Sequence, residues 1–156
     1  EVPPQASFSA TQTNGPAPLL VTFANASVGA QSYLWNFGDG NSSTQENPTH
    51  SYTNAGLYSV SLTASNAAGT NMLTRANFVV VPPGEDFALT NATLAGTNFQ
   101  FSFPTVSGFT YVVQFKNALD EATWQPWQTV PGDGLLQTVV VPVSGQPERY
   151  FRLRVE

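Results

Sequence analysis

Three aromatic residues alternate along one short stretch, at Tyr33, Trp35 and Phe37, and a Gly-Asp-Gly sequence follows at 38–40. In a β-strand every second side chain points to the same face. Glycine and aspartate are favoured in tight turns, because glycine accepts backbone angles that other residues avoid. The stretch therefore predicts a strand that places Trp35 in a hydrophobic core and ends in a turn.

Alternating apolar residues recur along the whole chain and predict a protein built almost entirely of strands. Sequences rich in Gly, Pro and Asn separate the runs, as expected for turns. Short strands at this spacing are typical of β-sandwiches. One helical turn is expected at 118–123. The expected strands are 6–11, 19–27, 32–37, 49–52, 57–65, 70–81, 86–93, 98–103, 109–116, 123–130, 135–142 and 149–155.

A Val-Pro-Pro-Gly sequence at 81–84 indicates a domain boundary, since prolines and a glycine follow a Val-rich strand. We therefore expect two domains, residues 1–82 and 83–156. The expected class is all-β, with two tandem immunoglobulin-like or fibronectin-III-like β-sandwiches. The first four residues, Glu-Val-Pro-Pro, look like a linker, so we expect a mature product or a segment of a larger protein.

The low charge content limits the partners that the chain can bind. Charged residues make up 10% of the 156 residues, and the net charge is −5. Nucleic acids and anionic membranes require clustered Lys or Arg, so neither is an expected partner. The chain has no cysteine, which excludes disulfides and thiolate metal sites. A neutral polar surface without disulfides suits an extracellular protein of bacterial origin.

The first half resembles the polycystic kidney disease (PKD) repeat, an immunoglobulin-like module, over about residues 5–82. The resemblance implies a β-sandwich that serves as a non-catalytic spacer or binding module. It depends on four stretches in their usual order: Trp-Asn-Phe-Gly-Asp-Gly at 35–40, His-Ser-Tyr at 50–52, Gly-Leu-Tyr-Ser-Val-Ser-Leu at 56–62 and Asn-Ala-Ala-Gly at 66–69.

The second half is similar to a C-terminal β-sandwich module found in large secreted proteins of Verrucomicrobia-like and Planctomycetes-like bacteria. The resemblance depends on Tyr-Val-Val-Gln-Phe at 111–115, Trp124, Pro-Gly-Asp-Gly at 131–134 and Arg-Tyr-Phe-Arg-Leu at 149–153. It implies that Trp124 is buried. It implies no particular activity.

The sequence shows no combination of residues that catalysis needs, so we expect that the chain is not an enzyme. His50 is the single histidine, and no serine occurs in a Gly-flanked elbow that could supply a nucleophile. Asp120 and Glu121 are adjacent rather than placed across a cleft. Asp133 lies in a Pro-Gly-Asp-Gly turn, where aspartate caps backbone amides. We interpret His50 as structural.

No cofactor is expected, with calcium as the one alternative. As the resemblance implies, calcium in some PKD-like domains lies near the turn that follows the Trp strand. Here Asn36 and Asp39 are the candidate ligands. Calcium takes about six to eight oxygen ligands, and Asp39 is the single carboxylate at this turn. The other interpretation is that both side chains bond to their own turn.

A polysaccharide is the leading ligand class, because sugar faces stack on exposed aromatic rings. Trp127 is expected to point outward, and Tyr150, Arg152 and Arg154 face away from the apolar residues of the last strand. Together these four residues form the candidate site, where arginine could bind the acidic groups of a polysaccharide. In the alternative interpretation, Trp127 covers a domain interface or a sheet edge.

These observations lead to two functional hypotheses. The first is a non-catalytic extracellular accessory region that acts as a spacer and adhesion module and binds polysaccharide. The alternative is a structural domain that self-assembles or contacts neighbouring domains, since the uncharged strand 137–141 is a candidate for edge pairing.

Overall fold

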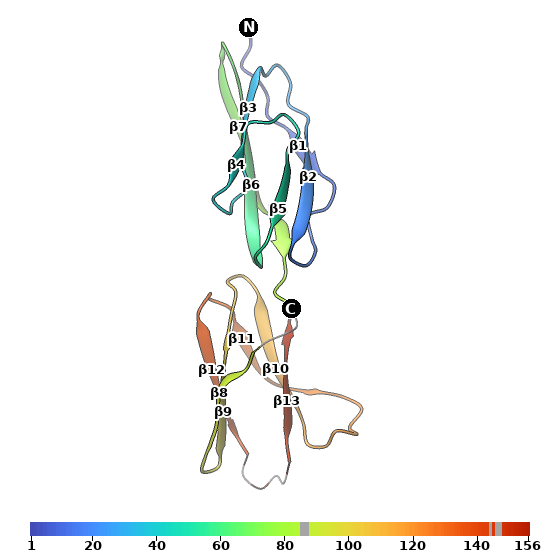
Figure 1. Ribbon diagram of the computed structural model, residues 1–156, viewed down its shortest axis with the longest axis vertical. Helices are drawn as coiled ribbons and strands as arrows, with labels where there is room; N and C mark the ends of the chain where they lie inside the picture. Colours follow the sequence, from blue (N-terminus) through green and yellow to red (C-terminus); the bar gives the residue numbers. More distant parts are fainter. Residues whose placement is uncertain (85–87, 144, 146–147) are drawn as a thin grey trace. The chain divides into compact units, whose positions relative to one another are not determined.

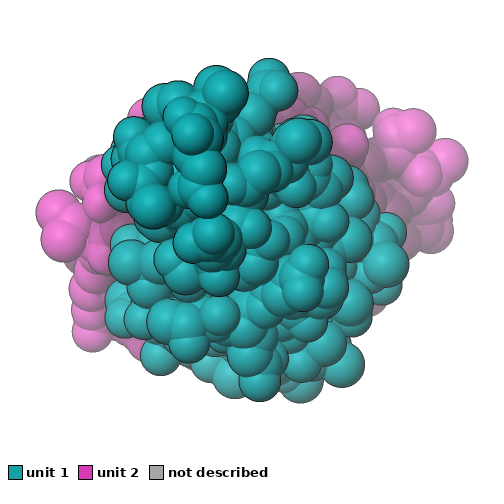
Figure 2. All heavy atoms as spheres, turned by 90° about the horizontal axis from the view of Figure 1, so that it is seen from above, with its two compact units in different colours: residues 1–82 teal, residues 83–156 magenta. Residues whose placement is uncertain are grey.

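The computed structural model describes residues 1–84, 88–143, 145 and 148–156. Every regular element in these ranges is a β-strand, so the all-β prediction is confirmed. The described ranges hold no helix with the length and apolarity needed to cross a bilayer. The chain divides into two compact units, residues 1–82 and 83–156, which Figure 2 shows in different colours.

The first unit is a sandwich of two antiparallel sheets (Figure 1). One sheet has the order β1-β2-β5, with β1 at Phe8–Ala10, β2 at Leu19–Asn25 and β5 at Thr49–Tyr52. The other has the order β4-β3-β6-β7, with β3 at Ser32–Asn36, β4 at Ser42–Ser43, β6 at Gly56–Asn66 and β7 at Gly69–Val81.

Trp35 fills the space between these two sheets. Its exposed fraction is 0%, and its ring centroid lies 5.2 Å from that of Phe8 and 5.4 Å from that of Phe23. The indole Nε1 donates a hydrogen bond to the Gln45 carbonyl at 2.9 Å, which satisfies the one polar atom of the buried ring. The prediction that Trp35 is a core residue is confirmed.

The second unit is also a sandwich of two antiparallel sheets. One has the order β12-β9-β8, with β8 at Thr90–Ala95, β9 at Asn98–Pro104 and β12 at Leu136–Pro142. The other has the order β11-β10-β13, with β10 at Thr110–Lys116, β11 at Gln125–Pro131 and β13 at Tyr150–Val155. Its core residues are at most 1% exposed: Phe101, Phe103, Tyr111, Val113, Val139 and Val141.

The turn before β12 is fixed by its glycine and aspartate. A Cβ on Gly132 would lie 2.2 Å from the Val106 carbonyl oxygen, so the close approach of this turn requires glycine. Asp133 Oδ1 accepts a hydrogen bond from the Leu135 amide at 2.9 Å. The predicted role of Asp133 as a cap of local amides is therefore confirmed.

Two local predictions differ from the structure. The short strand β4 was not expected, because a two-residue strand has no periodicity that a sequence can show. The expected helical turn at 118–123 is a single tight turn, in which the Glu121 amide donates to the Ala118 carbonyl at 3.3 Å. Residues 86 and 87 of the expected strand 86–93 lie outside the described residues.

Replacing Trp35 with alanine should lower the free energy of unfolding by about 3–5 kcal/mol, the range for a large aromatic removed from a core. Urea unfolding followed by circular dichroism measures this change. Leu34→Ala is the matched control, because Leu34 is the next residue of the same strand and is 50% exposed. Equal effects of the two substitutions would contradict the central packing of Trp35.

Candidate functional site

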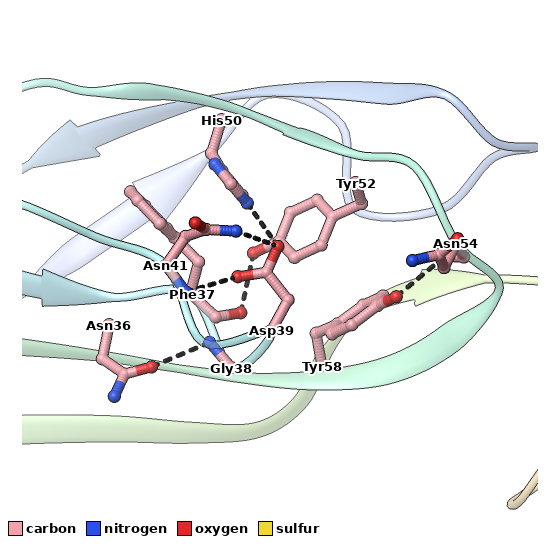
Figure 3. Close-up of polar contacts among 9 residues, drawn as sticks. All are labelled: Asn36, Phe37, Gly38, Asp39, Asn41, His50, Tyr52, Asn54 and Tyr58. Carbon is pink, nitrogen blue, oxygen red and sulfur yellow. Dashed lines mark hydrogen bonds and ion pairs between the residues drawn. The ribbon is translucent and has the colours of Figure 1, made fainter.

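The Gly-Asp-Gly turn of the first unit has a geometry that only glycine allows at its first position. Gly38 has a φ of 85°, and a Cβ there would lie 2.5 Å from the Ser59 carbonyl oxygen. The Asn36 side-chain oxygen accepts a hydrogen bond from the Gly38 amide at 2.9 Å (Figure 3). The Phe37 amide donates to the Asn41 carbonyl at 3.1 Å and closes the turn.

Asp39 is held by three hydrogen bonds at the centre of this turn. Its carboxylate accepts bonds from the Asn41 amide and side chain, each at 3.1 Å, and its Oδ2 lies 2.7 Å from His50 Nε2 (Figure 3). The side chains of His50 and Asp39 are 15% and 18% exposed. Partial burial raises the pKa of Asp39, but the bonds from His50 and Asn41 outweigh it and lower the pKa below 3.8.

His50 connects the turn to the edge of the core. Its ring stacks on Phe37, with centroids 4.3 Å apart and an interplanar angle of 4°, and meets Tyr52 edge-on at 4.8 Å. The Tyr52 hydroxyl donates to the Phe37 carbonyl at 3.0 Å, and burial raises the pKa of Tyr52 far above its ordinary value. In the part of the chain that the structure describes, no hydroxyl is hydrogen bonded to His50, so these contacts are those of a structural residue.

The calcium candidates Asn36 and Asp39 are engaged in these internal bonds. Asn36 offers its oxygen to Gly38, and both oxygens of Asp39 accept bonds from Asn41 or His50. Across the described ranges, no three His, Cys, Asp or Glu side chains gather as metal ligands. A hard cation takes about six to eight oxygens, whereas Asn36 and Asp39 supply three side-chain oxygens, and all three accept internal bonds. Calcium binding stays an untested prediction.

In the second unit, Tyr150, Arg152 and Arg154 alternate along β13 and lie on the outer face of its sheet. Arg152 Nε donates to Gln114 Oε1 at 2.7 Å, across the register pair of β13 and β10. Arg154 is 3.5 Å from the carboxylate of Glu156. The Tyr150 hydroxyl donates to Glu148 at 2.9 Å, and this bond raises the pKa of Tyr150.

Trp124 lies on this same outer face, which corrects the expectation that it is buried in the core. It is half-buried and lies in the loop that precedes β11. The guanidinium carbon of Arg152 is 4.6 Å from its ring centroid, and Lys116 Nζ is 5.1 Å from it. Lys116 Nζ also donates to the Glu121 carbonyl. Two cation–π contacts thus hold the loop 117–124 against the strands.

Trp127 is separated from the arginines. It is 40% exposed, and its ring lies edge-on to Phe115, with centroids 6.1 Å apart. Phe115 is the register partner of Phe151, whose ring stacks on Phe99 of the facing sheet, so both point inward. Arg152 points to the opposite face. The structure therefore groups Tyr150, Arg152 and Arg154, and it places Trp127 elsewhere.

A β-bulge explains the position of Trp127. Val113 pairs with Gln128, but Gln114 pairs with Pro126, so Trp127 is the extra residue in β11. A bulge turns a side chain away from the face that simple alternation assigns. The Pro126 next to Trp127 was a signal for this irregularity, since proline in a strand marks an edge or a bulge.

A polar residue at the Phe115 ring, Arg149, was missed. The guanidinium carbon of Arg149 lies 4.8 Å from the Phe115 ring centroid, so Arg149 and Trp127 contact the same ring. Arg149 Nε also donates to Asn117 Oδ1 at 3.3 Å. No periodicity could have shown this cluster, because Asn117, Trp127 and Arg149 lie far apart in the sequence. We call Trp127 and Arg149, which share the Phe115 ring, together with Asn117, which is bonded to Arg149, the Trp127 cluster.

The sandwich fold and the Trp-strand turn of the first unit define an immunoglobulin-like β module. Residues 1–81 match the family model of the PKD domain, so this chain belongs to the PKD domain family. The resemblance stated for the first half is confirmed.

Known relatives match a short part of the chain. Over 38 residues, this chain is 58% identical to collagenase ColA of Bacillus cereus, and it is 58% identical over 38 residues to the pre-pro-metalloprotease PrtV of Vibrio cholerae. Each match covers 24% of this chain and 4% of the relative. The crystal structure of the PKD1 domain of Vibrio anguillarum Epp is 39% identical, with a TM-score of 0.43, and covers 51% of this chain and 95% of that domain.

Asp39→Asn should lower the melting temperature at neutral pH, because Asn lacks the charge that His50 and Asn41 stabilise. The expected loss is roughly 0.5–1 kcal/mol for a partly exposed pair. The pKa of Asp39 is lower in the folded protein than in the unfolded chain, where it is 3.8. The ionised Asp39 therefore stabilises the fold above pH 3.8, and this stabilisation is lost as the pH falls through the pKa of the folded protein. The melting temperatures of wild type and Asp39→Asn should therefore become equal in strong acid.

Thermal melts of both proteins from about pH 7 to pH 2 test this prediction. Glu46→Gln is the control, since Glu46 is an exposed acid of the same unit. A difference between wild type and Asp39→Asn that stays constant down to the lowest pH would show that the Asp39 charge is not responsible.

Proposed function

We propose that this chain is a non-catalytic accessory region of an extracellular bacterial protein, in which the PKD unit is a spacer and the second unit binds polysaccharide. The observation that carries the proposal is Trp127, which is 40% exposed while its ring makes a T-shaped contact with Phe115. An exposed ring held in one orientation can stack on the CH face of a sugar with little loss of side-chain freedom.

Two polar residues at the Phe115 ring, Arg149 and Asn117, supply the polar part of such a site. Arg149 and Asn117 are hydrogen bonded to each other at 3.3 Å, and Arg149 contacts the same Phe115 ring as Trp127. Guanidinium and amide groups beside an aromatic ring can bond to sugar hydroxyls and fix the direction of the chain. The Trp127 cluster therefore combines a stacking surface with nearby hydrogen-bonding groups.

The outer-face residues Tyr150, Arg152 and Arg154 form a second contact in this proposal. Arg152 is already bonded to Gln114 and lies over Trp124, whereas the Arg154 side chain is 60% exposed. Arg154 is thus the better candidate to meet a carboxylate or sulfate of an acidic polysaccharide. Stacking on Trp127 and charge contact at Arg154 would be separate events on opposite faces of one sheet.

A non-catalytic role is supported by the bonds of the acid and base groups. His50 and Asp39 brace the turn, and Asp133 bonds to Leu135, Thr105 and Gln137 in its own turn region. The collagenase and metalloprotease relatives match over 4% of their length, so the matches give no reason to assign their activities to this chain. We propose that any catalysis belongs to other parts of a larger protein.

Trp127→Ala should remove most of the retardation of the chain in native gels that contain its polysaccharide, because it removes the stacking ring. The melting temperature should change little, since the ring is largely outside the core. Leu119→Ala is the matched control, because Leu119 is an apolar side chain of the adjacent loop and is 68% exposed. A panel of neutral and acidic polysaccharides in which none retards the wild type would contradict the proposal.

The purified chain should show no hydrolase or lyase activity on proteins or polysaccharides. The reason is that His50 is bonded to the turn residue Asp39, with no hydroxyl bonded to it among the described residues, and that Asp133 caps the Leu135 amide of its own turn. Release of reducing ends and of peptides is the measurement, with an assayed catalytic protein as positive control. Turnover that His50→Ala or Asp133→Asn abolishes would show that the chain is an enzyme.

A further inference from the structure

Among the described residues, the edge strands of the second unit's sheets are protected, with one exception. An open edge strand offers unpaired backbone groups to other chains, and proteins blunt such edges with charges, prolines or bulges. Strand β8 has a bulge between Thr90 and Thr93, and β11 has Pro126 and the bulge at Trp127. Strand β13 carries Arg152 and Arg154, which are exposed.

Strand β12 has none of these protections within Leu136–Val141. It pairs with β9 in an unbroken register, from Leu136 opposite Pro104 to Pro142 opposite Asn98. No charged residue occurs from 134 to 143. In the ranges that the structure describes, no other strand pairs with β12. The strand also exposes two apolar side chains, Leu136 at 55% and Val140 at 47%.

The hydrogen bonds at the two ends of β12 show which backbone groups point to the open edge. The Leu135 carbonyl accepts from the Thr105 amide at 3.0 Å, and the Val143 amide donates to the Thr97 carbonyl at 2.7 Å. Backbone groups alternate in direction along a strand, so the odd-numbered residues face β9. The amides and carbonyls of Leu136, Thr138 and Val140 therefore face the open edge.

We propose that β12 pairs in antiparallel fashion with β12 of a second copy of this chain, about a two-fold axis at Thr138. In this register Thr138 lies opposite Thr138 of the other copy, and Leu136 lies opposite Val140. Each of these pairs exchanges two backbone hydrogen bonds. A register centred one residue later would place Pro142 opposite Leu136, and proline has no N–H to donate.

The occupant is a second copy because the strand is complementary to itself. The two exposed apolar side chains, Leu136 and Val140, cover each other across the seam, and the paired threonine hydroxyls are favourable cross-strand neighbours. A two-fold axis brings the same surface together from both copies. The uncharged strand keeps the net charge of −5 on each copy away from the seam. A single edge buries a small area, so the dimer is weak and reversible.

A cysteine scan of the full chain tests the register directly, because the wild type contains no cysteine. Thr138→Cys should form a disulfide-linked dimer under mild oxidation, since the Cα atoms of such a pair are about 5.5 Å apart, within disulfide range. A mixture of Leu136→Cys and Val140→Cys should link to each other faster than either links to itself. Thr93→Cys, on the bulged edge β8, is the matched control and should remain monomeric.

A charge exchange tests the association without a covalent bond. Thr138→Lys and Thr138→Glu should each be monomeric in sedimentation equilibrium at concentrations where the wild type shows dimer, because like charges meet at the axis. Mixing the two variants should restore the dimer. Thr93→Lys should behave like the wild type, and thermal melts should show that all variants are folded.

Three results would overturn the proposal. One is a wild type that sediments as a monomer at every concentration up to its solubility limit. Another is cross-linking of Thr138→Cys no faster than that of Thr93→Cys. A dimer that persists in Thr138→Lys would also overturn it, because the contact would then lie elsewhere on the molecule.

Discussion

The burial of Trp35 determines the arrangement of the first unit. A ring of this size with an exposed fraction of 0% separates the two sheets, and its N–H must find an acceptor away from water. The Gln45 carbonyl provides it at 2.9 Å, which draws the segment after the Gly-Asp-Gly turn back over the core. The turn itself is then braced by Asp39 and His50, so the hydrogen bonds on the surface follow from the packing beneath them.

Sequence periodicity predicts the core well and the surface poorly, for physical reasons. Alternation reports which residues share a face, and Trp35, Phe101 and Phe103 are buried as their strands indicated. It cannot report contacts between strands distant in sequence, such as Arg152 over Trp124. It also fails at a bulge, where one extra residue shifts the alternation. Trp127 is exposed as expected, but it contacts Phe115 rather than the arginines of β13, and Trp124 lies against Arg152 instead.

The two units carry different kinds of information about function. The family match covers residues 1–81, whereas the proposed sugar-binding cluster and the unprotected strand β12 both lie in the second unit. Membership of the PKD family therefore explains the first sandwich and its turn without naming a ligand. The second unit combines an exposed tryptophan with an uncharged edge strand, and the proposed binding of polysaccharide and of a second copy depends on these two features.

The scarcity of basic residues also affects the resistance of the chain to proteolysis. Enzymes that cut after Lys or Arg have five sites here: Arg75, Lys116, Arg149, Arg152 and Arg154. Arg75, Lys116, Arg152 and Arg154 lie within strands β7, β10 and β13, and Arg149 directly precedes β13. A peptidase needs an extended segment free of its sheet, so cleavage at the strand sites requires local unfolding first. The fold thus shields most of the few bonds that a trypsin-like enzyme could recognise.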